Sequence, residues 1–382
     1  TVWAVARGHG CRPVGAFGLL LLGAYLVVTA TSILAAESLG VAVDAFRQQF
    51  LILLLVPALA FRRWTPDERR RMLRGFVVVA LVAGLYAMFR YLTGPSGAEA
   101  DLLRRTGAQT VNGEVGLIGS FLSRQELSGW TGVAIPALVA LVPLLQARWR
   151  LAVVIAFGTC TAALLASQTR AGLAAALGGT ALVIGLVGFA RNAGSRAGAL
   201  IVTIAVVFAL AAGGYGLTVG GDDTRSSRIA GVFNPTEDVT FDARRAKWRE
   251  TMRALDGKPV GYGLGTAGSV VRERGRFITV DTFNIDNSYL QLAYQQGFAM
   301  VALLLAAMAA LLTALIRAAI NGPSGEAPLR LAATGAVLAW LLVLTAGSYV
   351  ERECTVLAML LLGLALARSS VPSGRGPAAE AQ

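Results

Sequence analysis

The chain has 382 residues, of which 55% are hydrophobic and 15% charged, with a formal net charge of +12 at pH 7. This composition excludes an ordinary soluble protein, because apolar runs of about twenty residues, the length that crosses a bilayer, recur along the sequence. The positive charge does not indicate nucleic-acid binding, since most of it lies in short connectors between the apolar runs.

Ten apolar segments follow one another in the chain, at 14–34, 50–61, 75–92, 127–145, 151–166, 171–190, 199–217, 288–316, 331–349 and 355–367. Their length and composition predict an all-α polytopic membrane protein with about ten transmembrane helices. We expect helices 1–7 within residues 1–217, one large loop at 218–287 between the seventh and eighth helices, and helices 8–10 within 288–368. Residues 369–382 are expected to form a disordered tail.

Arginines are concentrated in alternate connectors, at Arg62, Arg63, Arg69, Arg70, Arg71, Arg74, Arg148, Arg150, Arg191, Arg196, Arg317 and Arg330. Such connectors are typically cytoplasmic. Arg7, Arg12 and Arg368 place both termini on that same side, which agrees with an even number of spans. The remaining connectors, including the large loop, are therefore predicted to face the outside.

The sequence offers few ligands for a metal or a disulfide. Cys11, Cys160 and Cys354 fall in separate segments, and the single histidine, His9, precedes the first predicted span on its cytoplasmic side. We therefore expect no metal site, no cofactor and no histidine chemistry on the outer face. The chain starts at Thr1 without a methionine or a signal peptide, which we interpret as an N-terminally incomplete copy.

The large loop holds roughly seventy residues, a length that is usually functional or disordered. Residues 240–255 are predicted to form an amphipathic helix, with Phe241, Trp248, Met252 and Leu255 on one stripe. Two interpretations of this helix are open: it lies at the membrane interface, or it covers a small outer domain.

Glycines alternate in the run Pro259-Val-Gly261-Tyr-Gly263-Leu-Gly265. No Gly-Lys-Ser/Thr follows, so a nucleotide-binding loop is disfavoured. The run instead predicts a turn through which backbone approaches the membrane or a ligand.

Arg170 lies between two apolar segments with almost no loop, and must therefore sit near the outer membrane boundary. An ionisable residue at that depth indicates function, although a snorkelling arginine that marks a helix end is the alternative. Arg244 and Arg245 are further candidates, because a guanidinium can bind phosphate through two hydrogen bonds. Almost every basic residue here is arginine, an excess that a high-GC genome alone would produce.

Asp286 stands immediately before the eighth predicted span. It could accept a proton from a hydroxyl nucleophile, or one of Asp286, Asn287 and Ser288 could simply cap the helix that follows. Because no histidine is available outside, a general base on that face must be a carboxylate or the substrate. The competing carboxylates are Glu126, Glu351 and Glu353.

Four features, taken in order, resemble the O-antigen ligase and polymerase superfamily of bacterial envelope glycosyltransferases. The tract Thr169-Arg170-Ala171-Gly172 is similar to its short Ser-Arg-Gly segment, and the late insert is similar to its large periplasmic loop. Arg244, Trp248 and the Pro259–Gly263 run resemble its Arg…Trp…Pro-x-Gly-x-Gly pattern. Asp286-Asn287-Ser288-Tyr289-Leu290 resembles its His-Asn or Asp-Asn segment, and the four features together cover about residues 151–308.

The resemblance implies a metal-independent, inverting transferase in the bacterial plasma membrane, with a glycan on undecaprenyl diphosphate as donor at the periplasmic face. By that analogy Arg170, Arg244 and Arg245 bind the diphosphate and Asp286 is the base, supported by Asn287, Tyr289 and Trp248. Lipid A-core ligases carry histidine where this chain has Asp286, so the aspartate looks more like the branch with polysaccharide polymerases.

The acceptor hydroxyl is expected on a glycan, a lipid or a protein, and the sequence does not separate a ligase from a polymerase. The alternative from another class is a transporter or flippase of an anionic lipid or sugar. Transporters place charged residues near the membrane midplane in broken helices, often within repeats. Here the charges gather at one face and no repeat is evident, so the sequence favours transfer.

Overall fold

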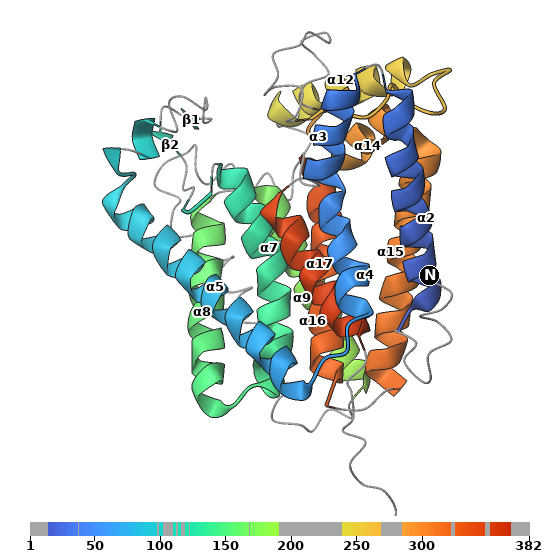
Figure 1. The fold of residues 1–382 in the computed structure, drawn as a ribbon. Helices are drawn as coiled ribbons and strands as arrows, with labels where there is room; N and C mark the ends of the chain where they lie inside the picture. The colour runs from blue at the N-terminus through green and yellow to red at the C-terminus, as the bar shows by residue number, and fades with distance from the viewer. Residues whose placement is uncertain are drawn as a thin grey trace, which may run out of the picture.

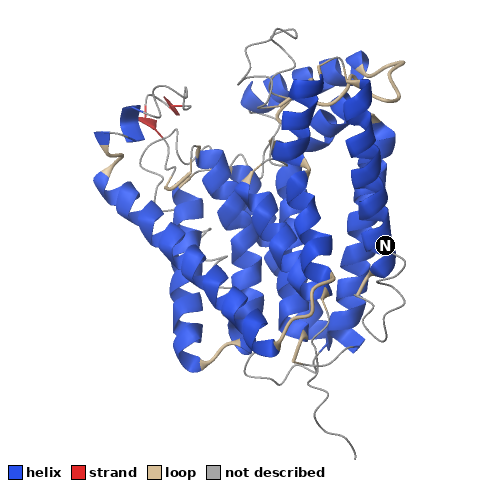
Figure 2. Ribbon diagram, viewed as in Figure 1, coloured by secondary structure: helices blue, strands red, loops and turns tan. Residues whose placement is uncertain are grey.

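The computed structural model describes residues 14–36, 38–97, 99–101, 110–111, 114–115, 119–121, 123–167, 169–190, 239–268, 285–321, 325–347 and 352–367. Within these ranges the chain is helical, apart from an antiparallel hairpin of β1 (Thr110–Val111) and β2 (Glu114–Val115) (Figure 2). The α-helices are α2 (Ala16–Ser32), α3 (Leu39–Gln49), α4 (Leu55–Ala60), α5 (Pro66–Thr93), α7 (Arg124–Leu141), α8 (Ala147–Ala166), α9 (Arg170–Ala190), α12 (Val239–Ala254), α14 (Ser288–Gln296), α15 (Phe298–Asn321), α16 (Ala327–Val343) and α17 (Glu353–Leu366). Short 3₁₀ turns are η1 (Ile33–Ala35), η2 (Leu51–Leu54), η3 (Val142–Leu144) and η5 (Leu344–Ala346).

The long helices form a bundle, with α12 and α14 gathered at one end of it (Figure 1). α7 is at its centre: every residue from Glu126 to Leu141 is buried, against α8, α9, α16 and α17. α5 packs on α8 at one side of the bundle and α2 packs on α15 at the other. Large apolar side chains on outward faces, such as Phe17, Val79 and Leu151, remain exposed where a bilayer would cover them.

Six helices of the described chain are long and apolar enough to cross a membrane, by length and composition. The bent pair Leu39–Gln49 and Leu51–Ala60 would add a seventh if counted as one span, and α2 and α17 are shorter apolar helices. Each predicted segment overlaps helices of the structure, except 199–217, which lies outside the described residues. A helical membrane protein is confirmed, and the count of ten spans stays a prediction.

The predicted eighth span, 288–316, is two helices rather than one. α14 ends at Gln296 and α15 begins at Phe298, because Gly297 between them has φ 82°. That conformation is unfavourable for a residue with a side chain. A Cβ at Gly297 would also collide with the carbonyl oxygen of Pro259, so the loop after α12 lies against this break.

Glycines bring α7, α9 and α16 into close contact. A Cβ on Gly132 of α7 would lie 2.8 Å from the carbonyl oxygen of Gly172 on α9, and one on Gly172 would collide with the carbonyl of Ser128. A Cβ on Gly179 would lie 2.7 Å from the carbonyl oxygen of Gly335 on α16. Small residues allow such backbone approach between membrane helices, where there is no hydrophobic driving force for association.

A buried ionic cluster fixes one end of the bundle. Arg69 of α5 pairs with Glu326 at 3.2 Å and bonds the carbonyl of Ala367 after α17. Arg330 of α16 also pairs with Glu326 and donates to the carbonyl of Ala318 on α15 at 2.7 Å. α17 therefore begins at the other end of the bundle, and α16 terminates there.

Three contacts place other helix starts at that same other end. Glu126 at the start of α7 pairs with Arg352 before α17, and Ser288 at the start of α14 bonds Gly347 after α16. Gly172 at the start of α9 lies against Ser128 of α7. We call this the site end, the end of the bundle at which α7, α9, α14 and α17 begin.

The glycine contact of α7 with α9 yields a prediction. Gly172→Val should destabilise the protein by about 1–3 kcal/mol, the usual cost of overpacking, because the added methyl groups would collide with the backbone at Ser128. Gly185→Val on the same helix is the matched control, since a Cβ at Gly185 meets no atom within 4 Å. Thermal unfolding in detergent measures both variants. Equal melting temperatures would contradict the close contact.

Candidate functional site

At the start of α14, the helix cap and the candidate base are two different residues. Asn287 is the N-cap: its side-chain Oδ1 accepts hydrogen bonds from the backbone N–H groups of Tyr289 and Leu290, at 3.0 and 3.2 Å. Asp286 is therefore not needed to cap the helix. Its backbone has φ 49°, the one positive φ of a non-glycine residue in the part of the chain that is described. Such backbone strain is often found at functional sites.

α12 holds Arg244 against Asp286. The indole Nε1 of Trp248 donates to the carbonyl oxygen of Ile285 at 2.9 Å, which ties α12 to the residue before Asp286. Arg244 lies one turn earlier on α12, on the same face as Trp248. Its Nε is 3.5 Å from Oδ2 of Asp286, with the two side chains 30% and 24% exposed. A cation and a carboxylate far apart in sequence are thereby brought together.

The apolar stripe predicted on α12 differs from the structure at Met252. Leu255, just after the helix, is buried and Trp248 is half-buried against the core, but Met252 is exposed. Arg245 is exposed as well, so of the two neighbouring arginines only Arg244 faces the start of α14. Phe241 lies among the residues whose side chains are not described.

Arg170 is the first residue of α9 and is half-buried. Two residues later Gly172 lies against Ser128 of α7, so Arg170 is at the site end beside the first turns of α7. A cation at a helix start is opposed by the helix dipole, and an anion bound there would relieve this repulsion. The described geometry thus places Arg170 and Arg244 at one end of the bundle, on different elements.

Ser288 and Tyr289 join the start of α14 to the end of α16. The Ser288 hydroxyl donates to the carbonyl of Gly347 at 2.5 Å, and the Tyr289 hydroxyl donates to the carbonyl of Leu341 at 2.7 Å. Tyr289, a predicted supporting residue, therefore anchors Asp286 and Asn287 to α16. The anchoring leaves Asp286 at the outer margin of the bundle, beside α12.

Residues 152–305, from α8 into α15, match the family model described as O-antigen ligase. We call residues 152–305 the O-antigen ligase domain, after the family model that they match. A search of the curated proteins finds no match to the chain. Arg170, Arg244 and Asp286 all lie within this O-antigen ligase domain, and the resemblance drawn from the sequence is confirmed.

The alternating glycines of the O-antigen ligase domain cap a helix. Backbone N–H groups of Tyr262 and Gly263 donate to the carbonyls of Tyr294 and Gln295 at 2.7 and 3.0 Å, so the run satisfies the C-terminal turn of α14. Gly261 has φ 70°, and a Cβ there would lie 2.7 Å from the Tyr294 carbonyl oxygen. The backbone does approach closely here, but the neighbour that the structure shows is the end of α14, where the sequence predicted the membrane or a ligand.

The competing carboxylates are in different environments. Glu126 is buried, 4% exposed, and its Oε1 lies 2.5 Å from Nη1 of Arg352. Glu353 is exposed on the first turn of α17, and Glu351 lies outside the described residues. Sequence reasoning did not single out Arg352, because it falls in a short polar turn and outside every motif.

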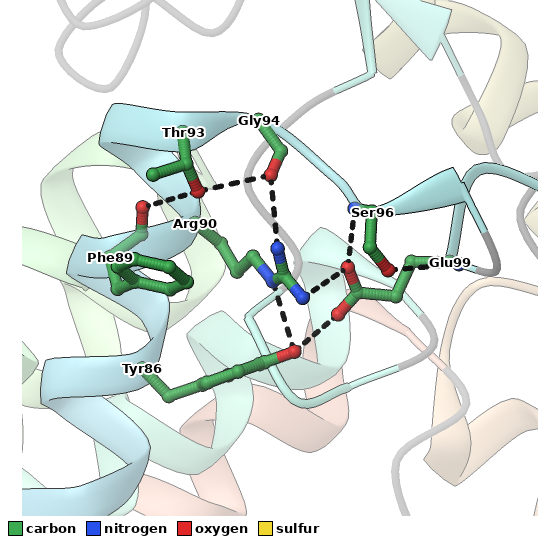
Figure 3. Close-up of polar contacts among 7 residues, drawn as sticks. All are labelled: Tyr86, Phe89, Arg90, Thr93, Gly94, Ser96 and Glu99. Atoms are coloured by element: carbon green, nitrogen blue, oxygen red, sulfur yellow. Dashed lines mark hydrogen bonds and ion pairs between the residues drawn. The ribbon is translucent and has the colours of Figure 1, made fainter.

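The polar segment after α5 is held by a second cluster, drawn in Figure 3. Glu99 accepts from the Tyr86 hydroxyl and from the backbone N–H of Ser96 at 2.7 Å, and pairs with Arg90 at 2.9 Å. The Tyr86 hydroxyl bond first, then the Ser96 bonds and the Arg90 charge, lower the pKa of Glu99 to about 2. This cluster fastens Ser96 and Glu99 to the end of α5.

The lowered pKa of Glu99 gives a pH-dependent prediction. A depressed pKa stabilises the fold above the ordinary value of 4.5, and this contribution is lost as pH falls through about 2. Glu99→Gln should lower the melting temperature near neutral pH, and its difference from wild type should shrink as the pH approaches 2. Glu250→Gln, at an exposed position on α12, serves as the control. A pH-independent difference would contradict the assignment.

Proposed function

We propose that the protein is a membrane glycosyltransferase that moves a glycan from undecaprenyl diphosphate to a hydroxyl acceptor, as an O-antigen ligase or a polysaccharide polymerase. The observation that carries the proposal is the juxtaposition of Arg244 and Asp286, at 3.5 Å, within the O-antigen ligase domain. The site end would face the periplasm, in a plasma-membrane protein of ten spans. The arginine-rich connectors support this orientation.

Arg244 and Arg170 would bind the donor's diphosphate. Both are arginines at the site end, and a guanidinium binds phosphate oxygens through two parallel hydrogen bonds with permanent charge. As the bond from the anomeric carbon to the phosphate oxygen breaks, negative charge accumulates on the diphosphate. Fixed cations stabilise that charge, so we propose a reaction that requires no metal ion.

Asp286 would act as the general base. Its carboxylate takes the proton of the acceptor hydroxyl while that oxygen attacks the anomeric carbon from the side opposite the diphosphate, which inverts the configuration. Undecaprenyl diphosphate leaves with the electron pair of the broken bond. Nε of Arg244 lies 3.5 Å from Oδ2 of Asp286, and a turn of the guanidinium toward the donor phosphate would release the carboxylate for the acceptor.

The remaining predicted residues hold this pair in place. Asn287 caps α14 beside Asp286, and Tyr289 anchors the start of α14 to α16. Trp248 bonds the carbonyl of Ile285 and so holds α12 where Arg244 contacts Asp286. Arg245, exposed on α12, would contact the donor only at the outer edge of the site. We therefore assign Arg245 a smaller part than Arg244.

Substitutions test these roles in the protein reconstituted with undecaprenyl-diphosphate glycan and hydroxyl acceptors. Arg244→Ala should lower kcat about 100-fold to 1,000-fold, as loss of a charge-stabilising group does. Asp286→Asn should lower it about 100-fold to 10,000-fold, as loss of a general base does, and asparagine tolerates the positive φ of this position. The measurement is the rate of glycan transfer at saturating donor.

Arg253→Ala, at an exposed position on the same helix, is the matched control and should retain full activity. Full activity of the folded Arg244→Ala and Asp286→Asn variants would contradict the proposed site. Product length in the same assay separates the two members of the class: single addition indicates a ligase and chain elongation a polymerase.

A further inference from the structure

Glu126 and Arg352 form an ion pair at the site end that the mechanism above does not use. Glu126 belongs to the first turn of α7, and its side chain is 4% exposed. Arg352 immediately precedes α17, and its Nη1 lies 2.5 Å from Oε1 of Glu126. Burying a carboxylate to this degree is costly, and the positive charge of Arg352 offsets part of that cost.

Glu126 and Arg352 differ in their local electrostatics and in their exposure to solvent. Glu126 is at a helix start, where the dipole favours an anion, and its backbone N–H is bonded by the side chain of Ser123 at 3.1 Å. Arg352 is also at a helix start, where the dipole opposes a cation, yet its side chain remains 33% exposed. A guanidinium has five N–H donors, so contact with Glu126 through Nη1 leaves others for a ligand.

Arg352 is connected to both halves of the proposed site. It follows Gly347 by five residues, and Gly347 accepts the hydroxyl of Ser288, two residues after Asp286. Five residues span at most about 17 Å. On the other side, Glu126 precedes Ser128 by two residues, and Ser128 meets Gly172 just after Arg170. Arginines from α9, α12 and the start of α17 therefore all lie at the site end.

We propose that Arg352 is a third phosphate-binding residue and determines the preference for a diphosphate over a monophosphate lipid, while Glu126 is its positioning residue. The inference rests on the proposed function, in which the donor is a diphosphate. A diphosphate has one more anionic group than a monophosphate, and Arg352 would share its binding with Arg170 and Arg244. Glu126 holds the guanidinium in one orientation and so reduces the entropy lost on binding. The same pairing makes Glu126 unsuited to act as the base.

The test compares undecaprenyl diphosphate with undecaprenyl monophosphate, bound to the full chain in nanodiscs of zwitterionic lipid. Arg352→Ala alone would remove the cation that faces the buried Glu126 carboxylate, a change that can destabilise the fold as a whole. The double variant Glu126→Gln with Arg352→Gln removes both charges and avoids that problem. Arg352→Lys keeps the charge but loses the planar fork of donors.

The double variant should bind the diphosphate lipid about 10-fold to 100-fold more weakly, the loss expected for a charged hydrogen bond, with little change for the monophosphate. Arg352→Lys should fall between the double variant and wild type. In the transfer assay the double variant should raise the KM for donor more than it lowers kcat. The matched controls, Glu353→Gln and Arg253→Ala, carry exposed charges at the same end and should behave as wild type.

Two outcomes would overturn the proposal, and they are distinguishable. If wild type prefers the diphosphate and the folded double variant keeps that preference, Arg352 has no part in it and the proposed function stands. If wild type neither binds undecaprenyl diphosphate nor transfers its glycan, the proposed function fails and this inference with it.

Discussion

The close contact of α7 with α9 and α16 is the constraint on which the rest of the structure depends. Helices in a bilayer gain nothing by hiding apolar surface from lipid, so backbones must approach closely to associate. Gly132, Gly172, Gly179 and Gly335 supply that approach. Because Gly172 meets α7 near its beginning, the contact also aligns the starts of α7 and α9. Arg170 in the first turn of α9 and Glu126 in the first turn of α7 are thereby brought to the same end of the bundle.

The polar insert is part of this site through its attachment to α14. Trp248 of α12 bonds the residue before Asp286, and the glycine run after α12 supplies the hydrogen bonds that the last turn of α14 lacks. α14 is thus held at both ends, at its start by α12 and α16 and at its end by the loop. A short helix fixed in this way can keep Asp286 in a strained backbone conformation.

The apolar runs of the sequence located the helices of the bundle. The family resemblance grouped Arg170, Arg244 and Asp286 in one site, but it did not predict the contact between Arg244 and Asp286. The sequence could not decide which of three consecutive polar residues caps α14, because Asp, Asn and Ser all favour that position. The structure assigns the cap to Asn287. The break at Gly297 involves a close contact with Pro259, which is distant in sequence and so does not show in the local pattern. Arg352 lies outside every motif, and its partner, Glu126, is 226 residues earlier in the sequence, so no local pattern connects the two.

We propose that the lipid-linked donor binds at the end of the bundle where α7, α9, α14 and α17 begin. Photocrosslinking of the wild-type protein in a bilayer, with undecaprenyl diphosphate carrying a diazirine next to its phosphates, tests it most directly. We expect the crosslinked peptides to come from the start of α9, from α12 and from the starts of α14 and α17. Crosslinks confined to the buried cluster of Arg69 and Arg330 at the other end of the bundle would contradict the claim.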